Sequence, residues 1–233
     1  GADLMIYDVE NHCSFTDSLV YGDTYMETFP AWTPDGKHLY FTRAQGYQKG
    51  MAFDSIRYDL CRISFDASTE KMGAPEIVLQ ASAQNKSISF PCVSPNGKYL
   101  MFTLSNYGNF SIWHPESDLY ILDLSTGETR DLENVNSNDV DSYHTWSSNG
   151  HWFVFSSKRM DGLWARPYIA SFNPETGETG KAFLLPQKDP MFYDNYTYTY
   201  NRPELIKKPV KNGKEFEKII PQAAILSTPK KNH

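Results

Sequence analysis

A short turn-containing segment occurs three times in this chain, and it limits the possible folds more than any other feature. The copies are residues 29–43, 90–103 and 143–156. Each contains a Pro-Asp-Gly-like turn, in which Gly36, Gly97 or Gly150 stands where the backbone must be left-handed. The residues after each turn place apolar side chains on both faces of a strand, which is typical of a strand buried between two layers. The sequence therefore predicts three equivalent hairpins, each covered on both sides.

A second recurring pattern follows each hairpin and completes a repeat unit. An Asp-Leu strand, a Thr-Gly-Glu turn and a further short strand come in that order, so each unit is a four-stranded antiparallel meander. The full copies span about 29–79, 90–132 and 144–185. The first-turn glycines lie about 60 and then about 50 residues apart, a spacing found in arrays of stacked repeats. A sheet that is apolar on both faces needs a neighbour on each side, which favours a β-propeller over a two-sheet sandwich. We therefore expect Trp32, Phe41, Phe102, Trp146 and Phe155 to be buried between neighbouring blades.

The hairpin segments resemble the TolB-type β-propeller repeat, which is a WD-like family. The resemblance rests on Trp-Thr-Pro-Asp-Gly-Lys from Trp32, Val-Ser-Pro-Asn-Gly-Lys from Val93 and Trp-Ser-Ser-Asn-Gly from Trp146. The stretch Ser-Ser-Lys-Arg-Met-Asp-Gly after Phe155 is also similar to that family, and the likeness covers roughly residues 3–185. It implies an all-β propeller of four-stranded antiparallel blades in a bacterial periplasmic or outer-membrane-associated protein. Such a repeat serves many proteins, so it specifies the fold better than the function.

The number of blades is open at this point. The chain starts at the third strand of a unit, and residues 190–206 alternate like the first strand of another blade. One alternative is part of a larger propeller, usually six-bladed in the family it resembles. The other is a closed four-bladed ring, in which residues 2–19 complete the sheet begun by 190–206. We expect blades over residues 1–206 and a Lys-rich tail over 207–233.

Composition excludes several classes of function. The net charge of −6 argues against a nucleic-acid partner. No apolar run reaches the ~18 residues of a membrane span, so we expect a protein that does not span the membrane. The three cysteines lack the spacing of a zinc or haem site, and neither a Gly-x-Ser-x-Gly elbow nor a phosphate-binding loop is present. We therefore expect no cofactor, no bound metal and no catalytic residue.

Loop lengths distinguish the two ends of each predicted blade. In an antiparallel meander the two tight turns lie at one end, and the middle connection and the link to the next blade lie at the other. The second end carries long, irregular loops rich in aromatic, arginine and histidine residues, which are common anchors of protein interfaces. The predicted binding-face residues are Tyr47, Arg57, Tyr107, Trp113, His114, Asp139, Asp141, His144, Arg159 and Trp164.

The segment Asp139–His144 has the densest group of potential ligands in the chain. His144 stands where the other two copies have Pro30 and Pro91. Asp139, Asp141 and His144 have the chemistry to hold a divalent metal or to form an acid–base pair. With a single imidazole and two carboxylates in a short loop, a solvated turn with a hydrogen-bonded histidine is the favoured alternative.

The resulting hypothesis is a non-catalytic propeller that binds a protein or a cell-envelope component. One alternative is an enzyme similar to oligogalacturonate lyases, which use related repeats and place histidine and metal ligands in the channel. The six scattered histidines argue against it. The other alternative is the propeller of a serine peptidase whose catalytic domain is not in this chain.

Overall fold

The computed structural model describes residues 2–209 and 228–229, and its main elements are three consecutive antiparallel blades. The first blade contains β3 (Tyr25–Trp32), β4 (His38–Gln45), β5 (Asp59–Asp66), β6 (Lys71–Met72) and β7 (Glu76–Leu79). The second contains β8 (Ser87–Val93), β9 (Tyr99–Ser105), β10 (Asp118–Asp123) and β11 (Thr129–Asp131). The third contains β12 (Asp141–Trp146), β13 (Trp152–Ser157), β14 (Arg166–Ser171) and β15 (Phe183–Leu184). The three predicted meanders are confirmed.

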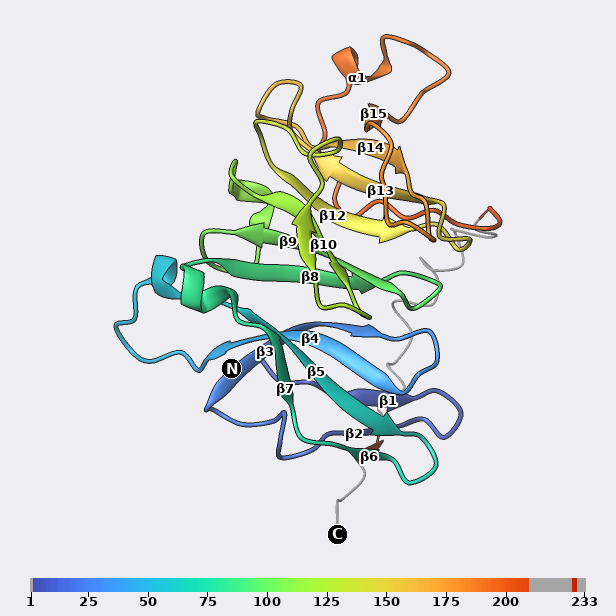
Figure 1. Cartoon of the computed structure of the whole chain (residues 1–233). Helices are drawn as coiled ribbons and strands as arrows, with labels where there is room; N and C mark the ends of the chain where they lie inside the picture. The colour runs from blue at the N-terminus through green and yellow to red at the C-terminus, as the bar shows by residue number, and fades with distance from the viewer. Residues whose placement is uncertain (1, 210–227, 230–233) are drawn as a thin grey trace.

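The blades stack face to face, as Figure 1 shows. Strand β9 illustrates why both faces of a strand are apolar. Leu100 and Phe102 pack toward the first blade, whereas Met101 packs toward Phe155 of the third. All four side chains are at most 1% exposed. Burial of both faces supplies the hydrophobic stabilisation that a single meander lacks.

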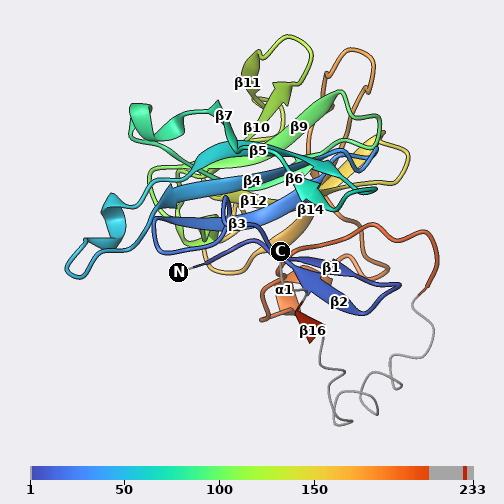
Figure 2. The ribbon, with the colours of Figure 1, turned by 90° about the horizontal axis from the view of Figure 1, so that it is seen from below.

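The N-terminal residues form a separate small sheet beside the first blade. It contains β1 (Ile6–Asp8), β2 (Cys13–Phe15) and β16 (Thr228–Pro229), and β16 pairs with β2 in parallel. Seen from below in Figure 2, β1 and β2 lie to one side of the stacked sheets. Leu4 and Val20, on either side of this hairpin, pack with Phe41 of β4.

The closed four-bladed alternative predicted a different pairing for these segments. Residues 190–206 contain the helical turn α1 (Phe192–Asn195) and no strand, so the prediction of a strand there is wrong. The N-terminal strands pair with each other and with β16 instead. A run of aromatic residues alternates like a strand, but here it covers the outer side of the third blade, where Asn201 accepts a hydrogen bond from Ser156 Oγ at 2.5 Å. Most of the predicted Lys-rich tail, residues 210–227 and 230–233, lies outside the described residues.

The turn glycines adopt the predicted left-handed conformation. Gly36, Gly97 and Gly150 have φ values of 69°, 72° and 71°. Within the described residues, the remaining helical structure is limited to the 3₁₀ turns η1 (Phe53–Ser55), η2 (Ala81–Gln84) and η3 (Ser111–Trp113).

The two tryptophans before the turns differ in burial, although both are predicted to lie between blades. Trp146 is partly buried, and its Nε1–H donates to the Cys92 carbonyl of the second blade at 3.0 Å. Trp32 is 42% exposed, so its predicted burial is wrong. The strands of the N-terminal hairpin are three residues long and cover only part of the first blade, so the Trp32 ring meets Phe65 but stays in contact with solvent.

The first strand of every blade contains a β-bulge at the same repeat position. Phe29, Phe90 and Tyr143 have φ values of 54°, 53° and 56°, and strand register shifts there. Their rings contact one another in a row. The Phe29 and Phe90 rings are tilted with centroids 4.1 Å apart, and the Phe90 and Tyr143 rings meet edge to face with centroids 4.7 Å apart. A left-handed aromatic residue is strained, and contact between neighbouring rings offsets that strain. Pro30 and Pro91 directly follow Phe29 and Phe90, within the bulges. A proline is tolerated there because the strand pairing needs no N–H donor at that position.

Candidate binding face

The long connections and the tight turns lie at opposite sides of the stack (Figure 1). On the turn side, Asn96 Nδ2 donates to the Pro174 carbonyl at 3.0 Å, and Lys98 pairs with Glu175 at 2.6 Å. These contacts join the first turn of the second blade to the second turn of the third. The separation predicted from loop lengths is therefore present.

The three long loops touch one another and form a continuous surface. The Gly108 N–H donates to the Ile56 carbonyl at 2.9 Å, which joins the loops of the first and second blades. Beside this bond the Phe53 and Tyr107 rings meet edge to face, with centroids 6.1 Å apart. Lys158 Nζ lies 4.1 Å from the Trp113 ring centroid and joins the loops of the second and third blades.

This surface exposes several large apolar side chains. We define the apolar face as Tyr47, Phe53, Phe110, Trp113, Met160, Leu163 and Trp164, which are between 36% and 78% exposed. All seven come from the loops between the second and third strands of the blades. Aromatic side chains present large contact areas that lose little conformational entropy on binding, so such a cluster suits recognition of a partner.

Trp113 is the most exposed of these residues, at 78%, and it is held in place from behind. Lys158 is only 7% exposed, and its ammonium group packs on the indole ring. A cation–π contact of this kind contributes about 0.5–2 kcal/mol. One ring face is therefore covered by the lysine, and the tryptophan is oriented before any partner arrives.

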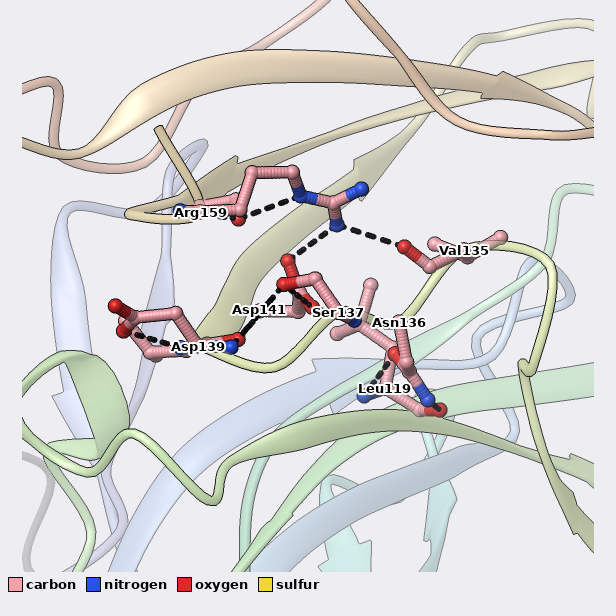
Figure 3. A network of polar contacts seen from close by, with 9 residues as sticks. Leu119, Val135, Asn136, Ser137, Asp139, Asp141 and Arg159 are labelled. Carbon is pink, nitrogen blue, oxygen red and sulfur yellow. Dashed lines mark hydrogen bonds and ion pairs between the residues drawn. The ribbon is translucent and has the colours of Figure 1, made fainter. Parts of the chain in front are cut away.

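A polar network supports the loops of the third blade (Figure 3). Asp141 is fully buried, and its Oδ1 accepts a hydrogen bond from Arg159 Nη2 at 2.5 Å. Asp141 Oδ2 accepts from the Ser137 N–H at 2.7 Å and from Ser137 Oγ at 2.9 Å. Burial raises the pKa of Asp141, and the Arg159 guanidinium opposes that rise. The carboxylate thus ties the link between blades to the first strand of the third.

The same link is also tied to the second blade. Asn136 Oδ1 accepts from the Leu119 N–H at 2.9 Å, while Asn136 Nδ2 donates to the Leu119 carbonyl at 3.0 Å. Arg159 Nη2 donates to the Val135 carbonyl at 2.7 Å (Figure 3). The network therefore fixes the position of two neighbouring blades and of the loop between them.

His144 does not belong to this network. Its ring is 1% exposed, and Nε2 lies 3.1 Å from the Met101 carbonyl of the second blade. The bond requires Nε2 to carry the proton. Burial lowers the pKa of His144 to about 3, so the ring stays neutral. It joins two blades and does not take part in a solvated acid–base pair.

The depressed pKa predicts a loss of stability in mild acid. Below the unfolded-state pKa of about 6.5 the unfolded chain binds a proton at His144, whereas the folded chain binds one only near pH 3. Stability is therefore fully present above about pH 6.5 and falls as the pH drops toward 3. Between about pH 7.5 and pH 5 the His144 contribution to the free energy of unfolding should fall by about 2 kcal/mol. Urea denaturation of wild type and His144→Gln at both pH values measures it, and an equal loss in both proteins would contradict the assignment.

Several predicted binding-face residues are buried. Asp141, His144 and His114 are 0%, 1% and 8% exposed, so they support the surface and do not reach a partner directly. The alternative of a solvated turn is wrong for Asp141 and His144, which lie within β12. His114 packs against the Tyr107 ring, with centroids 4.4 Å apart, and pairs with Glu116.

The other predicted residues vary in exposure. Trp113, Tyr47 and Trp164 belong to the apolar face. The remaining residues, Arg57, Tyr107, Asp139 and Arg159, are partly buried. Asp139 Oδ1 accepts a hydrogen bond from the Val140 N–H, and the Asp139 backbone bonds to the Ser137 hydroxyl.

The sequence interpretation missed two charged residues near this surface. Lys158 was overlooked because a lysine between a serine and an arginine gives no sign of burial. Asp118, at the start of β10, is partly buried, and burial together with the Asp141 charge raises its pKa to about 6. Among the residues that the structure describes, no group of three or more histidine, cysteine or acidic side chains could hold a metal ion. No helix in that part of the chain is long and apolar enough to cross a membrane.

Comparison with known proteins supports the fold. No protein-family model matches the sequence, and neither does any curated protein. An oligogalacturonate lyase solved in complex with manganese is similar over 78% of this chain and 48% of its own, with a TM-score of 0.54 and 15% identity. TolB from Acinetobacter baumannii is similar over 76% of this chain and 37% of its own, with a TM-score of 0.48 and 16% identity. A structure from an analysis of two prolyl endopeptidases is similar over 80% of this chain and 26% of its own, with a TM-score of 0.47 and 18% identity.

The chain thus spans less than half the length of these proteins. The likeness to the lyase, together with the three stacked meanders, shows a β-propeller fold. At such low identity the similarity concerns architecture and not activity.

Proposed function

We propose that this propeller is a non-catalytic binding module that recognises a protein or another component of the bacterial cell envelope through its apolar face. One observation carries the proposal. Seven large apolar side chains from three blades are exposed on one continuous side of the stack, whereas the opposite side carries short turns. Water contact with so much apolar surface is unfavourable, and a bound partner relieves it.

Contacts beneath the apolar face hold its side chains in place before a partner binds. Lys158 orients Trp113, and the Asp141–Arg159 network fixes the loop that carries Trp164. Preorganised side chains lose less entropy on binding, so a partner meets a surface already shaped for contact. The periplasmic or outer-membrane-associated setting is part of the same proposal and rests on the resemblance of the repeats to TolB-type sequences.

Trp113→Ala should weaken partner binding by about 2 kcal/mol, which is about 30-fold in Kd, because an exposed and oriented tryptophan is a typical hot spot. The partner would be isolated from a cell-envelope extract on the immobilised chain, purified, and titrated by calorimetry.

The matched control is Trp152→Ala, which removes a 39%-exposed tryptophan at the turn end. That variant, and Asp35→Ala in the first turn, should keep wild-type affinity. If Trp113→Ala binds normally while the turn-end variants fail, the binding surface lies at the opposite end.

A further inference from the structure

A pocket of about 550 Å³ opens beside the first blade, next to the part of the apolar face that comes from the η1 loop. The ends of β4 and β5 form one wall, and the loop that contains η1 forms another. Its volume lies within the range of small-molecule sites, and its walls are both polar and apolar. The short N-terminal hairpin leaves this half of the blade face uncovered.

Three charged side chains line the pocket. Arg43 is paired with a carboxylate, and Asp59 is hydrogen-bonded to a neutral serine and keeps its charge. Arg43 Nε pairs with Glu27 at 3.0 Å, and its Nη2 donates to the Leu19 carbonyl. The Asp59 carboxylate accepts the Ser82 N–H at 2.8 Å and Ser82 Oγ at 2.9 Å. These groups have little capacity left for a ligand.

Arg57 is different. Its Nη1 donates to the Asp54 carbonyl at 2.5 Å, but Nε is buried without a hydrogen-bond partner. Within residues 2–209, no carboxylate lies within ion-pair distance of this guanidinium. An unpaired, partly buried guanidinium lacks the compensation that such groups normally have, and a planar oxyanion supplies it through paired hydrogen bonds.

The other lining residues define the rest of the ligand. The Gln45, Gln80 and Asn85 amides offer donors and acceptors that carry no charge. Tyr25 and Ile77 offer apolar surface, and Ile77 is 60% exposed. We propose that this pocket binds a small organic anion, in which a carboxylate or phosphate monoester pairs with Arg57 and an apolar body lies against Tyr25 and Ile77.

The proposal is tested by titrating the whole chain with matched probes. Binding is monitored by calorimetry or by the NMR signals of the tyrosine and arginine side chains. Benzoate and phenyl phosphate carry both an anion and a ring, benzamide lacks the charge, and acetate lacks the ring. Benzoate or phenyl phosphate should bind at least about tenfold more tightly than benzamide and acetate, because only they satisfy both parts of the site. Equal binding of benzoate and benzamide would overturn the proposal.

Arg57→Gln should abolish that preference, and Arg57→Lys should retain part of it, since lysine keeps the charge but not the planar fork. The matched control is Arg62→Gln. Arg62 pairs with Glu76 at a distance of 2.7 Å and does not line the pocket. Circular dichroism verifies that the variants fold. If Arg57→Gln and Arg62→Gln lose the same affinity, the effect is one of net charge and no specific site exists.

Discussion

Replacement of Phe155 by alanine is expected to lower the free energy of unfolding by about 3–5 kcal/mol. The side chain is 0% exposed and lies in the cluster between the second and third blades, with Met101 and Leu119 of the second blade in the same cluster. Its ring also lies 6.0 Å from the Tyr168 ring. The strands on both sides are held by their own hydrogen bonds, so the cavity left by the ring cannot close fully. The loss therefore includes both the transfer energy of the ring and the cavity.

Phe53→Ala serves as the control for this measurement. It removes the same atoms from a ring that is 63% exposed in the η1 loop, and it should cost less than about 1 kcal/mol. Urea denaturation of the three proteins gives the comparison. Similar losses for Phe155→Ala and Phe53→Ala would mean that the interface between the second and third blades contributes little to stability.

Much of the fold could be predicted because its local rules repeat. The turn glycines Gly36, Gly97 and Gly150 have a conformation that few other residues adopt, and alternation on both strand faces predicted burial between layers. Three copies of one pattern are far more informative than one. The same reasoning failed at Trp32, because burial there depends on the length of the N-terminal hairpin and not on the repeat itself.

The candidate site was predictable in its position but less so in its chemistry. Loop length separated the two ends of each blade, and Trp113 and Trp164 are exposed at the predicted end. For Asp141 and His144 the sequence spacing suggested one shared centre. The carboxylate instead bonds to Ser137 and Arg159, and the imidazole meets the Met101 carbonyl of the second blade. Contacts between blades cannot be derived from spacing within one.

Replacement of Asp141 by alanine is expected to cost about 3 kcal/mol of folding stability. The carboxylate is fully buried and accepts three hydrogen bonds, so its loss leaves the Ser137 N–H, Ser137 Oγ and one Arg159 donor without this acceptor. The Arg159 side chain retains 19% exposure and still reaches the Val135 carbonyl, which keeps the effect at the lower end of the range for buried pairs.

A double-mutant cycle separates the ion pair from the loss of packing. The double variant Asp141→Ala/Arg159→Ala should lose at least about 1 kcal/mol less free energy of unfolding than the sum of the two single variants. The reason is that each single change leaves the other partner unpaired. The matched control is Glu175→Ala, which breaks an ion pair of similar length. Glu175 and Lys98 are 2.6 Å apart, and their side chains are 75% and 50% exposed, respectively. Water and salt screen that pair, so its loss should cost far less stability than the loss of Asp141. If the Asp141 and Arg159 changes were simply additive, the ion pair would contribute nothing to stability beyond the separate packing of the two side chains.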